Sequence, residues 1–345
     1  MRKILAGIVG AGFSAERHAA GYKALPTVEI GAVAGLKASK KETEEFARKL
    51  GAKRAFTNYE DLLKQDDIEI ISICAPNYLH QPIAVATAER GKHIILEKPL
   101  ARSVEEGQSM VDAARKAGVK LMYAENFQYA PSFVKAMEIV GQGGIGEIFM
   151  ATAREGHSGP HSRWFYDLDL AGGGALIDLG IHDVQLLRMF TKSEVKEVSA
   201  ATLKTQRDLS VEDNAVATMK FSNDALGTLE ESWTTKGGYD IRVELYGKEG
   251  LLIINPTRMT PLQVFSATGF GYAGEKVEFT SGWTYPVPEE FFAFGYIQEI
   301  EHFVKCVLED TKPNTTGLDG LMTLRVVMAM YESARIEKTV TVKPL

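Results

Sequence analysis

The first third of the sequence alternates short apolar runs with longer amphipathic segments, and this alternation restricts the possible folds more than any other feature. Runs rich in Ile, Val, Leu and Ala predict strands at residues 4–9, 28–35, 68–75, 92–98 and 119–125. The segments between them have helical periodicity, and several end at a glycine. This order predicts βαβ units and a parallel sheet with helices on its faces.

The pattern changes after Pro131. A helix is expected there, then a strand near 147–154, and further helices near 174–190, 289–308 and 319–336. Alternating polar and apolar residues separated by turn residues predict an antiparallel sheet, with strands at residues 215–221, 226–233, 239–247, 250–255, 262–267 and 275–280. The predicted fold is α/β, with a doubly wound domain in residues 1–124 and an α+β domain with a large, open, mostly antiparallel sheet in 125–345.

Composition excludes several classes of protein. The chain has 345 residues, 45% of them hydrophobic, and a net charge of −6. Without a basic cluster this charge argues against nucleic-acid binding, and the apolar runs are too short for a membrane span or a signal peptide. Cys74 and Cys306 lie in apolar segments and are expected to be free, buried thiols. A cytoplasmic location is the default expectation.

A glycine-rich motif directly follows the first predicted strand. Gly10, Gly12 and Ala15 form G-x-G-x-x-A at the start of a predicted helix. Gly10 would allow a tight turn, Gly12 a close approach of a pyrophosphate, and Ala15 close contact between helix and strand. The backbone N–H groups near Phe13 and Ser14 would then hold the phosphates. The alternative is an ordinary tight turn without a ligand.

The end of the second predicted strand bears on the choice of cofactor. An acidic residue commonly binds the ribose 2′-hydroxyl of NAD there, but this chain has Gly35 at that position. Lys37 and Ser39 follow, and Lys40 and Lys41 come next. These residues favour NADP over NAD because they can bind a 2′-phosphate. Alternatively, the lysines only solvate the start of a helix.

Two later strand ends carry further candidates, because ligands bind outside the carboxyl ends of parallel strands. The candidate cofactor-binding residues there are Ala75, Pro76, Asn77, His80, Glu97 and Lys98. Lys98 could donate or accept a proton if desolvation lowers its pKa. A surface ion pair between Glu97 and Lys98 is the competing interpretation.

The second half contains a polar stripe on an apolar helix. Asp178, His182 and Gln185 lie at i, i+4 and i+7, after the glycines 172–174. Such a stripe must face partners or a ligand. Asp178 could hold His182 in one tautomer and leave its other nitrogen free for proton transfer. The alternative is a hydrogen-bonded pair in the core.

Upstream, the segment REGHSGPHSRWF resembles a substrate loop in its content of donors and aromatic rings. His157, His161 and Arg163 can donate hydrogen bonds, and Trp164 can stack on a sugar ring. A polar surface loop is the competing interpretation. No metal is expected, because no third ligand has convincing spacing from the histidines.

Taken together, the motifs G-x-G-x-x-A, APNYLH, EKPL and GGGALIDLGIHD resemble, in this order, the Gfo/Idh/MocA oxidoreductases. The resemblance implies a Rossmann domain and a second domain with a large, mostly antiparallel sheet. It also implies hydride transfer between NAD or NADP and a carbinol or carbonyl carbon of a sugar, cyclitol or related polyol. Homodimers or homotetramers, often packed through the sheet faces, are implied as well.

The resemblance also assigns roles to individual residues. Lys98, Asp178 and His182 would line the reacting centre, and the Lys98–Pro99 peptide would be cis. The segment AENFQYAPSF makes Gln128 a candidate cofactor contact and Glu125 and Asn126 candidate substrate contacts. Many members have Arg in place of Gln128.

Two other functions remain open from the sequence. A retained NAD could oxidise a sugar transiently, so that the enzyme is a hydrolase or lyase. A dinucleotide-responsive regulator without turnover is the third possibility, but the intact set of Lys98, Asp178 and His182 counts against it.

Overall fold

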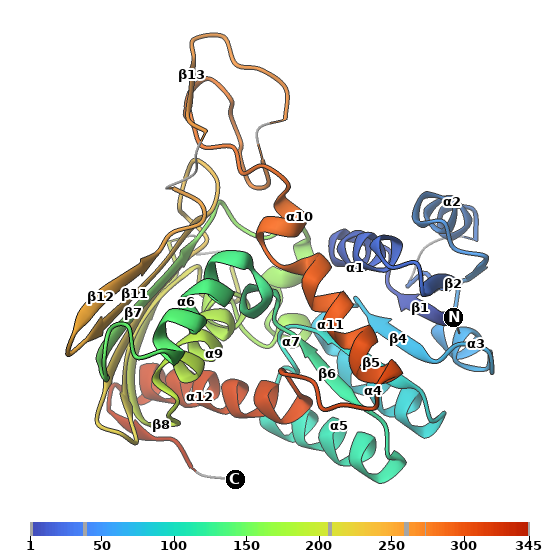
Figure 1. The fold of residues 1–345 in the computed structure, drawn as a ribbon, viewed down its shortest axis with the longest axis horizontal. Coiled ribbons are helices and arrows are strands. Elements are labelled where there is room, and N and C mark those ends of the chain that lie inside the picture. Colours follow the sequence, from blue (N-terminus) through green and yellow to red (C-terminus); the bar gives the residue numbers. More distant parts are fainter. Residues whose placement is uncertain (1–2, 37–39, 206–208, 259–261, 273, 344–345) are drawn as a thin grey trace. The chain divides into compact units, whose positions relative to one another are not determined.

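A computed structural model describes residues 3–36, 40–205, 209–258, 262–272 and 274–343 (Figure 1). Two compact units form: one from the N-terminus to Tyr129 with Gly295–Leu321, the other from Ala130 to Phe294 with the residues from Met322 onward. A C-terminal segment therefore returns to the first unit, which the linear pattern of the sequence does not indicate. The functional division at residues 124 and 125 stays a prediction.

The first unit contains the predicted parallel sheet, with six strands in the order β3-β2-β1-β4-β5-β6. Its strands are β1 (Ile4–Val9), β2 (Val28–Ala34), β3 (Arg54–Phe56), β4 (Ile70–Ile73), β5 (His93–Glu97) and β6 (Leu121–Ala124). The sequence missed β3, which is three residues long and only half-buried. The strand order reverses between β1 and β4, and doubly wound sheets bind ligands at such a switch point.

Helices on this sheet include one from the far end of the chain. The unit contains α1 (Phe13–Ala24), α2 (Lys40–Leu50), α3 (Tyr59–Leu63), α4 (His80–Glu89), α5 (Val104–Ala117), α11 (Tyr296–Leu308) and the 3-10 turns η1 (Asn77–Leu79) and η2 (Asn126–Tyr129). Helix α11 lies beside α1 (Figure 1). A Cβ at Gly21 would lie 2.6 Å from Cβ of Ile300, so this glycine lets the two helices approach closely.

The second unit is built on a sheet of seven strands in the order β12-β11-β7-β10-β9-β8-β15. Its strands are β7 (Ile148–Gly156), β8 (Val195–Leu203), β9 (Asn214–Phe221), β10 (Leu226–Ser232), β11 (Asp240–Gly247), β12 (Gly250–Ile254) and β15 (Val340–Thr341). All neighbours pair antiparallel except β7 and β10, which are parallel. The prediction of a mostly antiparallel sheet is confirmed.

Two of the predicted strands behave differently. The run at 262–267 contributes β13 (Val264–Ser266), which pairs with β14 (Gly282–Thr284) in a separate two-stranded ribbon. The strand expected at 275–280 does not form, and that prediction is wrong. Its residues bind the 157–161 loop instead: Lys276 Nζ donates to the Gly159 carbonyl at 2.7 Å.

One face of this sheet is contacted by α6 (Pro131–Gly141), α8 (Ala175–Asp178) and α9 (Gly180–Thr191) (Figure 1). The unit also contains α7 (Leu168–Ala171), α10 (Glu290–Ala293), most of α12 (Gly317–Ile336) and the 3-10 turn η3 (Arg163–Tyr166). The helix predicted at 174–190 is interrupted at Leu179, and that at 289–308 near Gly295, whose φ is 87°.

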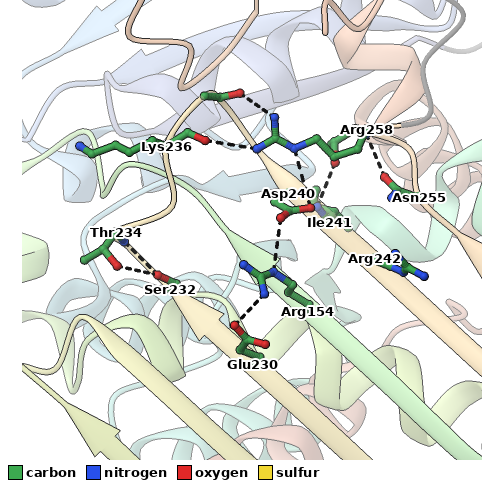
Figure 2. A network of polar contacts seen from close by, with 12 residues as sticks. Arg154, Glu230, Ser232, Thr234, Lys236, Asp240, Ile241, Arg242, Asn255 and Arg258 are labelled. Atoms are coloured by element: carbon green, nitrogen blue, oxygen red, sulfur yellow. Dashed lines mark hydrogen bonds and ion pairs between the residues drawn. The ribbon is translucent and has the colours of Figure 1, made fainter. Parts of the chain in front are cut away.

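The other face of this sheet carries polar and apolar side chains that point away from the helices. Arg154 on β7 donates to Glu230 on β10 at 2.7 Å and lies 3.3 Å from Asp240 on β11 (Figure 2). Between such pairs, Val216 is 52% exposed and Leu226 is 53% exposed. A shallow groove of 720 Å³ crosses the face between β8 and β11. Within the described chain, this face is open.

Candidate functional site

The turn between β1 and α1 is shaped by Gly10. Its φ of 121° disfavours other residues, and a Cβ there would lie 2.0 Å from the carbonyl oxygen of Cys74. The first glycine of the motif is therefore required by the approach of the turn to the end of β4. Ala15, the last position of the motif, is fully buried.

Gly12 is in a different situation. A Cβ built on it meets no heavy atom of the described protein within 4 Å, and the residue is exposed. It precedes α1, whose N-terminus has no side-chain cap, and Phe13 and Ser14 form the first turn. The N-terminus of a helix attracts anions through its backbone N–H groups and its dipole. The open space at Gly12 and this uncapped end fit a diphosphate.

The loop after β4 is held to the loop after β5 by His80. This fully buried side chain places Nε2 2.8 Å from the Ala75 carbonyl and Nδ1 2.9 Å from the Pro99 carbonyl. Burial lowers the pKa of His80. The structure therefore shows His80 as a link between two strand ends. Its role in cofactor binding, with that of Pro76 and the buried Asn77, stays a prediction.

Lys98 follows β5 and is half-buried. The Lys98–Pro99 peptide is cis, as the family resemblance implies. The backbone N–H of Lys98 donates to Oε2 of Glu97 at 3.2 Å, and Oε1 of Glu97 lies 3.1 Å from His18 Nε2. Burial raises the pKa of Glu97, but the hydrogen bond from His18, with the positive charge of Lys98, outweighs burial and holds the pKa below its usual value.

Glu125 and Gln128 occupy the loop after β6. Glu125 is fully buried and its Oε2 accepts from the Gln128 N–H at 3.3 Å. The side-chain Oε1 of Gln128 is buried and has no hydrogen-bond partner among the described residues. Because an orphaned acceptor is costly, its position at this edge fits a ligand that donates a hydrogen bond, such as a carboxamide. Asn126, beside them, is also buried.

The sequence analysis missed Glu299 on α11. This side chain is 1% exposed, and its Oε1 has no hydrogen-bond partner in the described part of the chain. Burial, followed by the negative charges of Glu97 and Glu125, raises its pKa well above the ordinary value. Glu299 lies one turn before Phe303 on the apolar face of its helix. An acidic residue on that face was the available signal.

In the second unit, Asp178 lies at the end of α8 and is 6% exposed. Its Oδ2 accepts from the Trp233 indole N–H at 3.0 Å and lies 3.9 Å from His157 Nε2. Nδ1 of His157 accepts from the Gly159 N–H at 3.0 Å, so a neutral His157 carries its proton on Nε2, on the side of Asp178. The structure thus brings together two residues that the sequence placed in separate segments.

The other two residues of the polar stripe, His182 and Gln185, both lie on α9. Gln185 Oε1 accepts from Thr323 Oγ1 at 2.5 Å and from Arg188 at 3.0 Å, which ties α9 to α12. His182 is buried in the same helix. A role for Asp178 in fixing the tautomer of His182 stays a prediction.

The three glycines before α8 have a packing explanation. Gly172 ends α7 with a φ of 86°. A Cβ at Gly173 would lie 2.1 Å from Tyr331 Oη, and one at Gly174 would lie 1.9 Å from the Glu212 carbonyl oxygen. Glu212 Oε1 accepts from the backbone N–H of Gly174 at 3.1 Å and from Tyr331 at 2.7 Å. The run of glycines therefore seats α8 against a buried carboxyl group.

The predicted substrate loop contacts residues that the sequence did not single out. His161 Nε2 lies 3.0 Å from Oε1 of the buried Glu275, which also accepts from Tyr239 at 2.9 Å. Trp164 stacks on Phe165 with ring centroids 3.8 Å apart. Arg163 is exposed.

Behind Asp178, three buried acids lie between α9 and the sheet: Asp183, Glu231 and Glu155. Burial and the charges of the other two raise the pKa of Glu231 well above its ordinary value. No group of three or more His, Cys, Asp or Glu side chains arranged to hold a metal occurs among the residues described. None of the helices described combines the length and apolar character needed to cross a bilayer. Lys37 and Ser39 lie outside the described residues.

A doubly wound sheet with an anion-accepting turn at its switch point defines a dinucleotide-binding protein. Comparisons with known sequences agree. Residues 4–125 match the profile of the Gfo/Idh/MocA "oxidoreductase family, NAD-binding Rossmann fold", and residues 133–253 match the Gfo/Idh/MocA C-terminal domain. A levoglucosan dehydrogenase from Pseudarthrobacter phenanthrenivorans is 30% identical, over 99% of each chain.

Solved structures are similar over the same length. A crystal structure of GenD2 from gentamicin A biosynthesis, in complex with NAD, has a TM-score of 0.94 and 29% identity, covering 100% of this chain and 97% of GenD2. Levoglucosan dehydrogenase in complex with NADH and L-sorbose has a TM-score of 0.87 and 27% identity, with 100% of both chains covered. The chain belongs to the Gfo/Idh/MocA family of NAD-binding oxidoreductases.

The raised pKa of Glu299 predicts a pH-dependent stability. Unfolded Glu299 loses its proton near the ordinary pKa of 4.5, whereas the folded protein retains it. Unfolding therefore releases a proton, and the free energy of unfolding falls with rising pH, by up to about 1.4 kcal/mol per pH unit. Glu299→Gln removes this cost, so the variant should gain stability over the wild type as the pH rises from 5 to 8, as measured by urea unfolding. The exposed Glu301→Gln should show no such trend; parallel curves for all three proteins would contradict the prediction.

Proposed function

We propose that this protein is an NAD(P)-dependent dehydrogenase or reductase acting on a carbinol or carbonyl carbon of a sugar, cyclitol or related polyol. The observation that carries the proposal is the edge of the first sheet, where Gly12, Lys98 and Gln128 follow three different strands. Relatives over the full length include a sugar dehydrogenase bound to NADH and a sugar. A nicotinamide bound at this edge would accept or deliver hydride at its C4 atom.

Lys98, Asp178 and His182 supply the proton chemistry in this proposal. In the oxidation, either Lys98 or His182 takes the hydroxyl proton while the substrate carbon loses hydride. The other of these two residues, assisted by Asp178, stabilises by hydrogen bonding the negative charge that develops on the substrate oxygen. His157 and Trp233, which contact or approach Asp178, fix the position of that carboxylate. Substrate contacts are assigned to Glu125, Asn126 and the 157–164 loop.

Removing either proposed proton carrier should slow chemistry far more than dinucleotide binding. Lys98→Ala and His182→Ala should each lower kcat by roughly 10²–10⁴-fold, while the Kd of the dinucleotide stays within a few-fold of the wild-type value. A panel of sugars and cyclitols followed by nicotinamide absorbance identifies the substrate, and fluorescence titration gives the Kd.

Lys116→Ala, which changes an exposed lysine on α5, is the control and should retain full turnover. Wild-type turnover in both site variants would refute the assignment. Release of an aglycone or elimination product without net nicotinamide reduction would instead identify a hydrolase or lyase that retains its NAD. Dinucleotide binding without turnover on any substrate would identify a regulator.

We also propose that the chain prefers NADP. Gly35, buried at the end of β2, leaves no carboxylate to repel a 2′-phosphate. Lys40 and Lys41 at the start of α2 are exposed, and their amines lie 3.9 and 4.0 Å from Glu44 and Glu45 on the same helix. The bound NAD and NADH of the relatives establish the binding of a nicotinamide dinucleotide in those proteins, and the missing carboxylate supports the 2′-phosphate here.

Two variants separate the pyrophosphate contact from packing. Gly12→Ala and Gly141→Ala both add a Cβ that meets nothing within 4 Å, so both should fold with wild-type stability. Only Gly12→Ala should weaken dinucleotide binding, by roughly 10²-fold, because its Cβ occupies the space assigned to the pyrophosphate.

The cofactor preference is tested on the wild-type protein. It should bind NADP about tenfold more tightly than NAD, as expected for one charge-assisted hydrogen bond. Calorimetry measures the Kd of each dinucleotide for wild type and for the variants. Tighter binding of NAD than of NADP would overturn the proposed preference. Unchanged dinucleotide binding by Gly12→Ala would overturn the proposed pyrophosphate site.

The open face of the second sheet supports a homo-oligomer. Val216 and Leu226 are half-exposed there. Val216 pairs with Glu230, which forms an ion pair with Arg154 (Figure 2). Broad apolar exposure on a sheet face is typical of a surface that packs against another protein. A second copy of this chain can pair the same mixed face with itself through a two-fold axis.

A charge introduced into this face should dissociate the oligomer. Wild-type protein should have a mass in solution that is a multiple of 37.9 kDa, by light scattering after gel filtration. Val216→Glu should shift it toward 37.9 kDa, because burying an unpaired carboxylate is unfavourable. Val134→Glu on α6, at a similarly exposed valine of a covering helix, should leave the mass unchanged. A monomeric wild type would contradict the proposal.

A further inference from the structure

A continuous chain of hydrogen bonds is buried under the first sheet's candidate cofactor edge. Tyr22 Oη lies 2.7 Å from Ser72 Oγ, and Ser72 Oγ lies 2.9 Å from His18 Nδ1. His18 Nε2 lies 3.1 Å from Glu97 Oε1, and Glu97 Oε2 accepts from the Lys98 backbone N–H at 3.2 Å. Tyr22, Ser72 and His18 are each at most 1% exposed. The hydrogen bonds therefore run from the last turn of α1 to the backbone of the proposed proton carrier.

The secondary structure explains why these side chains meet. Ser72 on β4 pairs with Ile95 on β5, and side chains of paired residues in parallel strands point to the same face. Glu97 lies two residues beyond Ile95 and therefore shares that face. His18 and Tyr22 are four residues apart on α1 and present one stripe to it.

The donors can all point the same way. The lowered pKa of Glu97 describes a carboxylate, which only accepts hydrogen bonds. His18 then donates from Nε2, so a neutral ring accepts at Nδ1 from the Ser72 hydroxyl, and Ser72 accepts from Tyr22. Every member is satisfied with neutral His18, and the aligned hydroxyl dipoles increase the donor strength of His18.

Other ionisable groups around Glu97 do not replace this donor. Glu299 faces it from α11, and Cys74 from the end of β4; burial raises the pKa of both groups. His80 contributes positive potential from α4, but its two nitrogens contact carbonyl oxygens. Glu125, after β6, adds negative charge near Glu299, as Glu97 does. Among the described residues, His18 is the histidine that hydrogen-bonds to Glu97.

We propose that His18 is a positioning residue for Lys98: by donating to Glu97 it keeps that side chain ionised and in place, and Glu97 in turn fixes the Lys98 backbone and sets the charge beside its amine. This inference rests on the proposed role of Lys98 in proton transfer. Without the His18 donor, burial favours the protonated form of Glu97. Lys98 then loses both a backbone acceptor and a neighbouring negative charge.

The test compares His18→Leu, which removes the donor, with His18→Gln, whose amide N–H can replace Nε2–H. The protein without dinucleotide is treated with a limiting amount of an amine-reactive acetylating reagent at a series of pH values. Mass spectrometry then measures the fraction of Lys98 that is acetylated. Loss of the Glu97 charge should lower the apparent pKa of the Lys98 amine by about one unit in His18→Leu. Its labelling at pH 8 should then rise by roughly threefold to tenfold, and His18→Gln should return it to within twofold of wild type. Lys116 in the same samples is the internal control.

Kinetics provide the second measurement. His18→Leu should lower kcat at least tenfold and leave the dinucleotide Kd within about threefold, and His18→Gln should recover most of kcat at its own optimum pH. Equal Lys98 labelling in wild type, His18→Leu and His18→Gln overturns the inference. An equal loss of kcat in both variants overturns it as well. If His18→Leu is too unstable, Glu97→Gln, which removes the same charge while preserving shape, must raise Lys98 labelling. Because labelling needs no substrate, its outcome is independent of whether the proposed reaction is found.

Discussion

The close approach of the β1–α1 turn to the end of β4 is the contact on which the first unit depends. Gly10 has to be a glycine because the Cys74 carbonyl oxygen lies where a Cβ would be. That approach brings the N-terminus of α1 to the edge where β4, β5 and β6 also end. Gly12 differs, because a Cβ there would meet no heavy atom of the described protein within 4 Å; the proposed dinucleotide, rather than the protein's own packing, would require glycine at this position.

Beneath this edge, two buried glutamates have opposite charge states for identifiable reasons. Glu97 has His18 as a donor and the Lys98 N–H as a second, and its pKa is lowered. Glu299 faces the charges of Glu97 and Glu125 with one oxygen unpartnered in the described chain, and its pKa is raised. Environments that separate the pKa values of neighbouring acids are frequent where proton chemistry occurs. The negative charge is thus concentrated next to Lys98, where it favours an ammonium group.

Local sequence patterns predicted five of the six strands of the first sheet, because these buried strands are continuous apolar runs and several of the helices between them end at a glycine. The short, half-buried β3 was missed. The same patterns did not predict that α11 completes this unit, since packing between distant segments leaves only an amphipathic stripe in the sequence. The prediction of a strand at 275–280 was wrong because the alternation of polar and apolar residues carries no information about distant partners. Glu275 and Lys276 bind His161 and Gly159, which lie more than 110 residues away in the sequence. The partner Trp233 of Asp178 was missed for the same reason, because it follows β10 whereas Asp178 ends α8.

The two glycine motifs show why residue type alone does not identify a site. Gly10, Gly173 and Gly174 are required by close contacts with the protein's own backbone or side chains, and Gly172 ends α7 with a φ of 86°. Gly12, in contrast, has open space beside it and stands at the uncapped N-terminus of α1. In the second unit, Asp178 and its partners are therefore the proposed site residues, and the glycines serve packing. The buried acids behind Asp178 make the same point from charge: burial and the negative charges of Asp183 and Glu155 raise the pKa of Glu231 well above its ordinary value, so burial in this cluster favours the protonated form of its carboxyl group.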